Sequence, residues 1–303
     1  MHIVSLTDAQ WDRLLCKSPY ATFFHISFWK NAVLRAFGGE CTLFQCEMDG
    51  KHWLIPVYRR ASGFSEFKMN SIGYGGPIPL FSMLDPIAAI REIRVIVACL
   101  EAECRAKCTG YVTFPCLSWE KMVLEPGEFC SYTQILPLHF DVEYVFEKVI
   151  RGKVRTAIRR AAKEGLSVRK IENQEVSEGY GLLVATQNSV RASYTTPYPF
   201  FKYLVEQSGK GVETWGGFDQ NGKMVAMSMM LHTKESSFHL FNGWDRQTAP
   251  IGANQAILWE MVLYSMRLGL KELNLGESHQ ESLRRAKEEW GSIFYPILKA
   301  KFA

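Results

Sequence analysis

Two segments of the chain share one alternation of apolar and polar residues and one kind of turn. Residues 41–60 read CTLFQCEMDGKHWLIPVYRR, two β-type runs joined by an Asp-Gly pair at 49–50. Residues 212–233 read VETWGGFDQNGKMVAMSMMLHT, two further runs joined by an Asn-Gly pair at 221–222. Tight hairpin turns favour these pairs because their central residues adopt a positive φ. Each segment is therefore predicted to be a β-hairpin.

Around each hairpin the apolar residues change to a helical spacing. A helical pattern rich in aromatic residues precedes each hairpin, at residues 24–39 and 199–211. A longer amphipathic helix follows the first hairpin. Asp85 is a good N-cap and Pro86 a good first helical residue, and the helix is predicted to continue to Gly110, before a strand.

The second half closes in the same order. A helix is predicted to begin at Gly252 and to end at Gly269, and a strand follows at residues 271–276. The repeated order predicts an α+β fold of two similar domains, residues 1–138 and 139–303. A single large α/β domain is the alternative, because 303 residues are enough for either arrangement.

Composition narrows the class of protein. With 47% hydrophobic and 22% charged residues, the chain has the balance of a globular protein. It has no apolar run of about 18 residues and its first residues lack the pattern of a signal peptide, so we expect a cytoplasmic protein. Eight cysteines form no CxxC pair, which favours buried, reduced thiols and predicts no metal site.

One segment is strongly basic. Between residues 151 and 170 there are eight lysines and arginines and one acid, Glu164, a local charge of 8 − 1 = +7. Apolar residues fall on one side of this predicted helix. A cationic stripe recurs every four residues on the other side, at Arg151, Arg155, Arg159 and Lys163. Like charges at this spacing repel, so the stripe indicates either an anionic ligand or acidic neighbours elsewhere in the fold.

The chain resembles the FemAB-like family over nearly its whole length. The segment at 20–38 is similar to the family's opening aromatic helix, and IGYGGPIPL at 72–80 to its Gly-Gly-Pro segment. The basic helix resembles the one that opens the family's second domain. Residues 251–276 resemble the helix and strand before its active region, and LRRAKEEWG at 283–291 its phenylalanine-lysine segment.

The resemblance implies two tandem GNAT-like domains, with mixed, largely antiparallel sheets flanked by helices. It departs from the family in two places. Ala286 stands where phenylalanine is frequent, and no helical-hairpin insertion, the coiled-coil arm of some members, separates Gly211 from Thr214. These departures favour a compact branch of the family.

The resemblance also implies acyl transfer. The donor is either aminoacyl-tRNA or an acyl-coenzyme A, no cofactor is expected to be tightly bound, and the acceptor is an amine on a phosphate-bearing cell-wall, polysaccharide or lipid-linked precursor. A peripheral membrane contact or a tRNA partner is compatible with this activity. By motif, Lys287 corresponds to the cation that stabilises the developing oxyanion. An exposed lysine among neighbouring charges is the alternative.

The remaining candidates lie at strand ends, loops and one helix start. Glu277 and His279 follow the last predicted strand and are candidate proton acceptors. The helix start at Gly252 and Asn254 offers free N–H groups for an anion, although its single glycine departs from acetyl-CoA loops. Candidate substrate contacts are Arg155 and Arg159 of the basic helix, Arg191 and Tyr198 of a polar-aromatic loop, and Trp29 and Tyr74 of the first half.

Three functional classes stay open at this stage. The first is an aminoacyl-tRNA-dependent transferase, which predicts salt-sensitive RNA binding. The second is an acyl-CoA-dependent N-acetyltransferase acting on a small amine, which predicts thioester consumption without RNA. The third is a non-catalytic binding protein that kept the fold.

Overall fold

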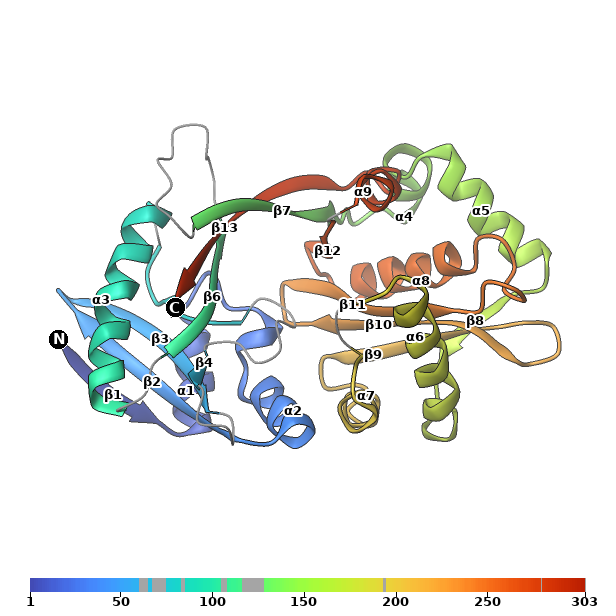
Figure 1. The fold of residues 1–303 in the computed structure, drawn as a ribbon. Coiled ribbons are helices and arrows are strands. Elements are labelled where there is room, and N and C mark those ends of the chain that lie inside the picture. Colours follow the sequence, from blue (N-terminus) through green and yellow to red (C-terminus); the bar gives the residue numbers. More distant parts are fainter. Residues whose placement is uncertain are drawn as a thin grey trace. The chain divides into compact units, whose positions relative to one another are not determined.

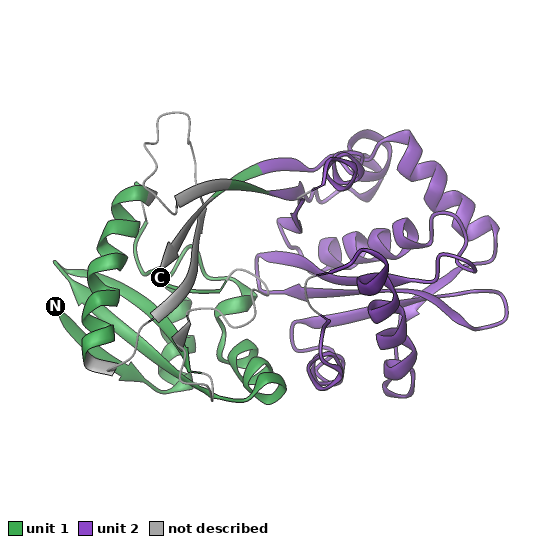
Figure 2. Ribbon diagram, viewed as in Figure 1, with its two compact units in different colours: residues 1–132, 295–303 green, residues 133–294 purple. Residues whose placement is uncertain are grey.

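The computed structural model describes residues 1–59, 65–66, 75–82, 85–104, 108–115, 128–192, 195–278 and 280–302. They form two compact units, residues 1–132 with 295–303 and residues 133–294 (Figure 2). The change of unit lies close to the predicted boundary at 138 and 139. The last residues of the chain belong to the first unit, which the sequence pattern does not indicate.

The first unit contains a sheet in the order β1-β2-β3-β4-β6-β13, with β5 paired to β3 (Figure 1). Its helices are α1 (Asp8–Leu15), the 3-10 turn η1 (Phe23–His25), α2 (Ser27–Phe37) and α3 (Pro86–Cys104). Its strands are β1 (His2–Leu6), β2 (Glu40–Met48), β3 (Lys51–Arg59), β4 (Ser65–Glu66), β5 (Ile78–Pro79) and β6 (Cys108–Pro115). The chain leaves this unit along β7 (Glu128–Pro137) and returns along β13 (Ile293–Phe302).

The core of the first unit follows from the two-residue period of β3. Trp53 and Ile55 face a cluster that contains the apolar side of α3. Leu54 points to the other face, where it packs with Trp11 of α1. Successive side chains of a strand alternate between faces, so one apolar run serves both layers.

The first predicted hairpin is confirmed. Met48 pairs with Lys51, and the residues between them have φ values of 52° at Asp49 and 74° at Gly50. The N-cap of α3 is also confirmed, because the Asp85 carboxylate accepts the N–H groups of Ile87 and Ala88. This helix ends at Cys104, earlier than predicted, and Gly110 is in β6, opposite Phe302 of β13. Pairing with a strand almost 200 residues away along the chain outweighs the local helical pattern there.

The second unit contains a sheet in the order β7-β12-β11-β10-β9-β8. Its strands are β8 (Ser167–Lys170), β9 (Val212–Phe218), β10 (Met224–His232), β11 (Ser236–Trp244) and β12 (Glu272–Glu277). Its main helices are α5 (Gly152–Lys163), α6 (Val176–Ser189), α7 (Tyr198–Glu206), α8 (Ala253–Arg267) and α9 (Glu281–Glu288). Shorter turns are α4 (Val142–Tyr144), the π-helical η3 (Val145–Val149) and η4 (Asn173–Glu175).

The helices of this unit cover both faces of the sheet. Helix α8 packs on β9 and β10 and carries α5 on its outer side, whereas α6 packs on β10 and β11 from the opposite face (Figure 1). The buried side of α5, with Val154, Ile158 and Ala161, is the apolar side predicted from the sequence. Gly211 leads directly into β9, which contains Thr214, so no insertion separates the two residues. The predicted α+β fold of the chain is confirmed.

The predicted hairpin between β9 and β10 is confirmed with a wider turn. Its loop runs from residue 219 to residue 223, and the Asp219 carboxylate accepts the N–H groups of Asn221 and Lys223, each at 2.9 Å. Gly222 has a φ of 78°, which a residue with a side chain rarely adopts. Among the described residues, no helix has the length and hydropathy of a membrane-spanning segment.

A buried carboxylate lies at the start of β9. Glu213 is fully buried and accepts hydrogen bonds from the Tyr264 hydroxyl at 2.8 Å and from the Ser208 hydroxyl at 3.2 Å. Lys170 Nζ lies 2.6 Å and His232 Nε2 3.8 Å from its oxygens. Burial by itself raises the pKa of Glu213, but the contacts from His232, Lys170 and Tyr264 outweigh burial and lower the pKa to about 2.

Candidate active site

The candidate site lies where two parallel strands of the second unit diverge. Strands β11 and β12 pair only over Ser236–Phe238 and Glu272–Asn274. Beyond this point β11 stays paired with β10, with a bulge between the pairs Met230–His239 and Met229–Phe241. Strand β12 follows β7 and also carries an irregularity, after Asn274. Where the two strands stop pairing, their backbone N–H and C=O groups no longer bond to each other.

The irregularity in β12 is held by Asn274. Its side-chain oxygen accepts the N–H of Gly276 at 2.7 Å and the hydroxyl of Thr133 at 2.6 Å. Gly276 has a φ of 78°. A side chain at this position would be strained, and its Cβ would lie 3.9 Å from Lys287 Nζ. The end of β12 is thus shaped to bring its carbonyl groups to Lys287.

Lys287 reaches this strand end from α9. Its ammonium group donates to the carbonyl oxygens of Gly276 at 3.0 Å and Glu277 at 2.9 Å. An ammonium has three N–H donors, so one donor is left for a ligand. Burial lowers the pKa of Lys287 from 10.5 to about 8, and the carboxylate of Glu277 raises it only in part. The side chain is half-buried and its position is fixed by the backbone, unlike that of an ordinary surface lysine.

Strand β7 supports the helix that carries Lys287. Gln134 is almost fully buried, and its amide group donates to the Arg284 carbonyl at 3.1 Å and to the Ser292 hydroxyl at 3.3 Å. Its oxygen accepts from Ser278 at 2.8 Å. The Ser292 hydroxyl in turn donates to the Lys287 carbonyl at 2.9 Å. Buried networks of this kind orient the side chains beside them.

A histidine that the sequence pattern does not single out is close enough to Lys287 for the charge of that lysine to act on it. His239 lies directly before the β11 bulge, and its Nε2 atom is buried with no hydrogen-bond partner among the described residues. Burial, and then the charge of Lys287, lower the pKa of His239 to about 4. The imidazole is therefore neutral near pH 7. In the sequence it is one polar residue inside the apolar run FHLF, which is equally typical of a core histidine.

Comparison with known proteins identifies the domain that carries this arrangement. Residues 148–284 match the family model described as an acetyltransferase (GNAT) domain. The second unit is a GNAT-type acyltransferase domain. Lys287 lies just beyond the matched residues and His239 within them. The chain is thus an acyltransferase, as the resemblance implied.

Solved structures extend the likeness over both units. FemX shares 11% identity with a TM-score of 0.68 over 98% of this chain and 97% of its own. The tandem GNAT protein from the clavulanic acid biosynthesis pathway shares 11% with a TM-score of 0.57, over 100% and 98%. The C-terminal domain of a putative lysylphosphatidylglycerol synthetase from Agrobacterium fabrum shares 13% with a TM-score of 0.55, over 98% and 93%.

These likenesses confirm the fold of two GNAT-like domains. A comparison of the sequence with curated proteins gives no significant match.

The GNAT-type domain brings together only part of the predicted site. Glu277 is half-buried at the end of β12, its carbonyl holds Lys287, and its carboxylate raises the pKa of that lysine. His279, the other predicted proton acceptor, is outside the described residues. Lys287 and Glu277 thus form one cluster, and its roles in catalysis remain predictions.

The predicted contacts of the basic helix are used within the protein. Arg155 donates to the carbonyl oxygens of Phe146, Glu147 and Ile150 at 3.2, 2.8 and 2.5 Å, which closes the end of η3. Arg159 pairs with the Glu147 carboxylate at 2.8 Å. These contacts agree with the second explanation of the cationic stripe, in which acidic neighbours in the fold balance it. Little of the Arg155 guanidinium is left for a substrate, whereas the Arg159 side chain is 62% exposed. Substrate contacts with either residue stay a prediction.

At the start of α8, Gly252 is in close contact with α5. Its φ is 95°, and a Cβ atom there would lie 2.1 Å from the Ala157 carbonyl oxygen. Close packing against α5 therefore explains why residue 252 is a glycine, without any role in binding a ligand. Asn254, in the first turn of α8, keeps a buried Oδ1 atom with no partner in the described part of the chain. That acceptor is available to a ligand.

The change Gly252→Ala tests the packing reason. The methyl group would meet the backbone of α5 and would hold a left-handed conformation, so we expect a loss of about 1–3 kcal/mol in the free energy of unfolding. Urea titration of the purified variant measures it. Gly269→Ala is the matched control, because Gly269 also has a positive φ, of 71°, but meets nothing within 4 Å. Equal losses in the two variants would contradict the packing explanation.

The other two predicted residues of the second unit lie near α6. Arg191 is exposed just after this helix and has a φ of 50°. The Tyr198 hydroxyl lies 3.1 Å from that of Ser177, and its ring packs edge-on against Tyr180. Among the described residues, neither Arg191 nor Tyr198 contacts Lys287 or His239. Their part in substrate binding stays a prediction.

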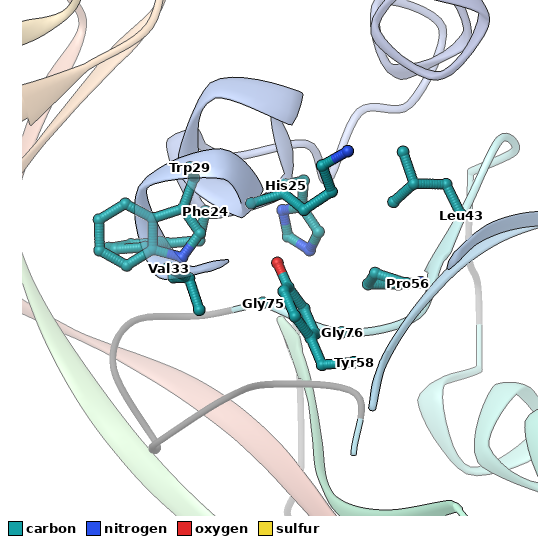
Figure 3. Close-up of a pocket in the computed structure, with 10 residues that line it drawn as sticks. Phe24, His25, Trp29, Val33, Leu43, Pro56, Tyr58, Gly75 and Gly76 are labelled. Carbon is teal, nitrogen blue, oxygen red and sulfur yellow. The ribbon is translucent and has the colours of Figure 1, made fainter. Parts of the chain in front are cut away.

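In the first unit, Trp29 lies inside an aromatic cluster. It is 3% exposed and packs edge-on against Phe23 and Phe24. It lines a void of about 10 Å³ toward which the Tyr58 hydroxyl points from below His25 (Figure 3). This space suits about one water molecule and no substrate. Tyr74, its predicted companion, is outside the described residues.

A larger hollow lies on the α6 side of the GNAT-type domain. It has a volume of about 420 Å³, within the range of ligand pockets, and it was not predicted. One face of α6, the start of β10 and the residues after β11 line it. Its lining includes Leu182, Ala185, Met224, Trp244 and Arg246. Its walls are largely apolar, so it suits an uncharged part of a ligand.

Proposed function

We propose that this acyltransferase moves an aminoacyl or acyl group onto an amine of a phosphate-bearing acceptor, such as a cell-wall, polysaccharide or lipid-linked precursor. The observation that carries the proposal is the position of Lys287. Its ammonium is half-buried, two of its donors are held by the end of β12, and the third is left over. A fixed, desolvated cation is what the developing oxyanion of acyl transfer requires.

Acyl transfer requires the protein to assist proton removal and to stabilise negative charge. The acceptor nitrogen must lose its proton before or during attack, and the carbonyl oxygen of the donor must gain a stabilising contact as it becomes negative. Lys287 supplies the second. Because the gap between β11 and β12 opens beside it, the donor carbonyl is expected to enter there.

Two donors agree with the fold. The match to an acetyltransferase (GNAT) domain supports a coenzyme A thioester, and the name of the tandem GNAT neighbour mentions acetyl-CoA. The name of the lysylphosphatidylglycerol synthetase neighbour supports an aminoacyl group and a lipid acceptor. Both donors have an acyl carbonyl that Lys287 would serve in the same way.

Two cations of the α5 stripe are available to the phosphate of the acceptor. Of the cationic stripe on α5, Arg151 and Lys163 are exposed, and no ion pair is given for either among the described residues. They are therefore free to meet an anion at the surface. Exchanging both for glutamine is expected to weaken binding of a phosphate-bearing acceptor without changing the rate with a neutral amine.

A labelled-donor experiment tests the function. The protein is incubated with acetyl-coenzyme A or with aminoacyl-tRNA, and with phosphoethanolamine, ethanolamine or a nucleotide-linked peptidoglycan precursor as acceptor. Label that passes to the phosphate-bearing acceptors and is lost in Lys287→Met supports the proposal. Equal use of ethanolamine favours the second candidate, a coenzyme A-dependent N-acetyltransferase for small amines, which the GNAT match supports. No transfer to any acceptor would favour a non-catalytic binding protein.

A further inference from the structure

The position of His239 is unusual for a strand histidine. The last pair between β11 and β12 joins Phe238 and Asn274, so His239 is the first residue of β11 past that pairing. The bulge in β11 follows it directly. The residue before it, Phe238, and Lys287 both lie close to Gly276. A Cβ atom built at Gly276 would be 3.8 Å from the Phe238 ring and 3.9 Å from Lys287 Nζ. His239 is therefore at the point where the strands open.

The hydrogen bonds of the ring define which nitrogen is free. The backbone of Phe241 favours a proton on the ring. Nε2 is buried with no partner among the described residues, so that proton is assigned to Nδ1. With Nδ1 carrying the hydrogen, Nε2 presents a bare lone pair. Buried polar atoms without partners are rare and call for an explanation.

We propose that His239 Nε2 accepts the proton of the acceptor amine while Lys287 holds the oxygen of the acyl group. This inference rests on the proposed acyl transfer and adds the base that the transfer needs. It uses a side chain that neither the family resemblance nor the sequence pattern singled out.

The reaction proceeds in two stages. An N–H bond of the acceptor ammonium breaks and an N–H bond forms on Nε2; the electron pair left on nitrogen forms the new bond to the acyl carbon, and a second proton of that nitrogen passes to water. The carbonyl π electrons pass to its oxygen, beside Lys287. When they return, the bond from the acyl carbon to the donor's sulfur or oxygen breaks, and that atom takes the proton back from Nε2.

The surroundings of His239 suit this order of events. Burial is the main reason why its pKa is near 4, and the charge of Lys287 adds to it. The ring is thus neutral and able to accept a proton before the reaction. When negative charge develops on the acyl oxygen, it offsets the charge of Lys287, and the imidazole becomes more basic as the proton arrives.

The kinetic test compares His239→Gln with the native protein on two acetyl acceptors. With ethanolamine, which is protonated at neutral pH, we expect kcat/KM to fall roughly 10²–10³-fold. With hydroxylamine, whose nitrogen is unprotonated at that pH, we expect a fall of less than about tenfold. Lys287→Met should lose both reactions. His2→Gln, a change of an exposed histidine on β1, is the matched control and should lose neither.

A measurement without substrate keeps the inference testable by itself. Nitrogen NMR of the histidines at pH 7 is expected to show the neutral Nδ1–H form for His239. A ring protonated on Nε2 would overturn the assignment, as would equal losses on the two acceptors or an unchanged rate with ethanolamine. If the native protein acetylates neither acceptor and transfers no aminoacyl group, the proposed function fails, and that result is distinct from a native protein that is active without His239.

Discussion

Lys287→Met is expected to lower the rate of acyl transfer roughly 10²–10³-fold, the usual effect of removing one donor to an oxyanion. Methionine has nearly the length of lysine and keeps the packing of α9, but it gives the acyl oxygen no contact. The loss should fall on kcat, with KM for the donor little changed, because the contact is made mainly in the transition state. Steady-state kinetics with a saturating acceptor separates the two constants.

The same variant should be as stable as the native protein, or more so. Since burial lowers the pKa of Lys287 from 10.5 to about 8, the folded state binds this proton less tightly than the unfolded chain does. The group therefore destabilises the fold at neutral pH, by an upper limit of about 3 kcal/mol, and that penalty is relieved as pH rises from 8 to 10.5. A residue that lowers stability while it supports activity is typical of a functional site.

The pH dependence gives a second test of Lys287. Only the charged amine stabilises an oxyanion, so the rate should fall as pH rises through about 8. In Lys287→Arg the guanidinium stays charged, and that fall should disappear even if the rate is lower. Arg285→Met is the matched control, because Arg285 is exposed on the same helix and pairs with Glu281. A variant of Lys287 that unfolds more easily and keeps its rate would mean a structural role only.

Glu213→Gln is expected to lower the free energy of unfolding by about 3 kcal/mol at pH 7. The change removes the buried charge that the exposed Lys170 and the half-buried His232 face, and leaves both without that partner. The pKa of Glu213 lies at about 2, below its ordinary value of 4.5, so the ionised carboxylate stabilises the fold above pH 4.5 and that stabilisation is lost as pH falls toward 2. Urea titrations at pH 7, 4 and 3 measure it.

The difference between the native protein and Glu213→Gln should therefore shrink with falling pH. Glu235→Gln is the control, because Glu235 pairs with Lys271 on the surface, where both side chains are more than 70% exposed. Exposed pairs contribute little, so its urea midpoint should hardly move. A constant difference between pH 7 and pH 3 would show that the charge of Glu213 does not carry the effect.

Local features of this chain could be predicted because short segments determine them. The hairpin at Asp49 and Gly50 needs only two residues that tolerate a positive φ, and the start of α3 needs only Asp85 ahead of Pro86. The buried side of α5 follows from its apolar spacing in the same way. In each case the relevant atoms lie within a few residues along the chain, so propensity and pattern decide the outcome.

Lys287 was found by a different route. The composition and spacing of the residues around Lys287 suggest no more than a charged surface helix. The resemblance to a family motif singled out the lysine. The structure adds a reason that the motif lacks, namely its two bonds to the end of β12 and its lowered pKa. His239 had no motif to mark it, and its meaning depends on the bulge in β11 and on the charge of a residue from α9.

By itself, then, the sequence determined the elements of this protein, the order in which they repeat and the likeness that led to acyl transfer. Only the tertiary structure decided that Arg155 is used to close η3, that the last strand returns to the first unit, and that the charge of Lys287 acts on His239. The physical reason is the distance along the chain. Hydrogen bonds, burial and charge act between atoms a few ångströms apart, and folding brings together residues that no local pattern connects.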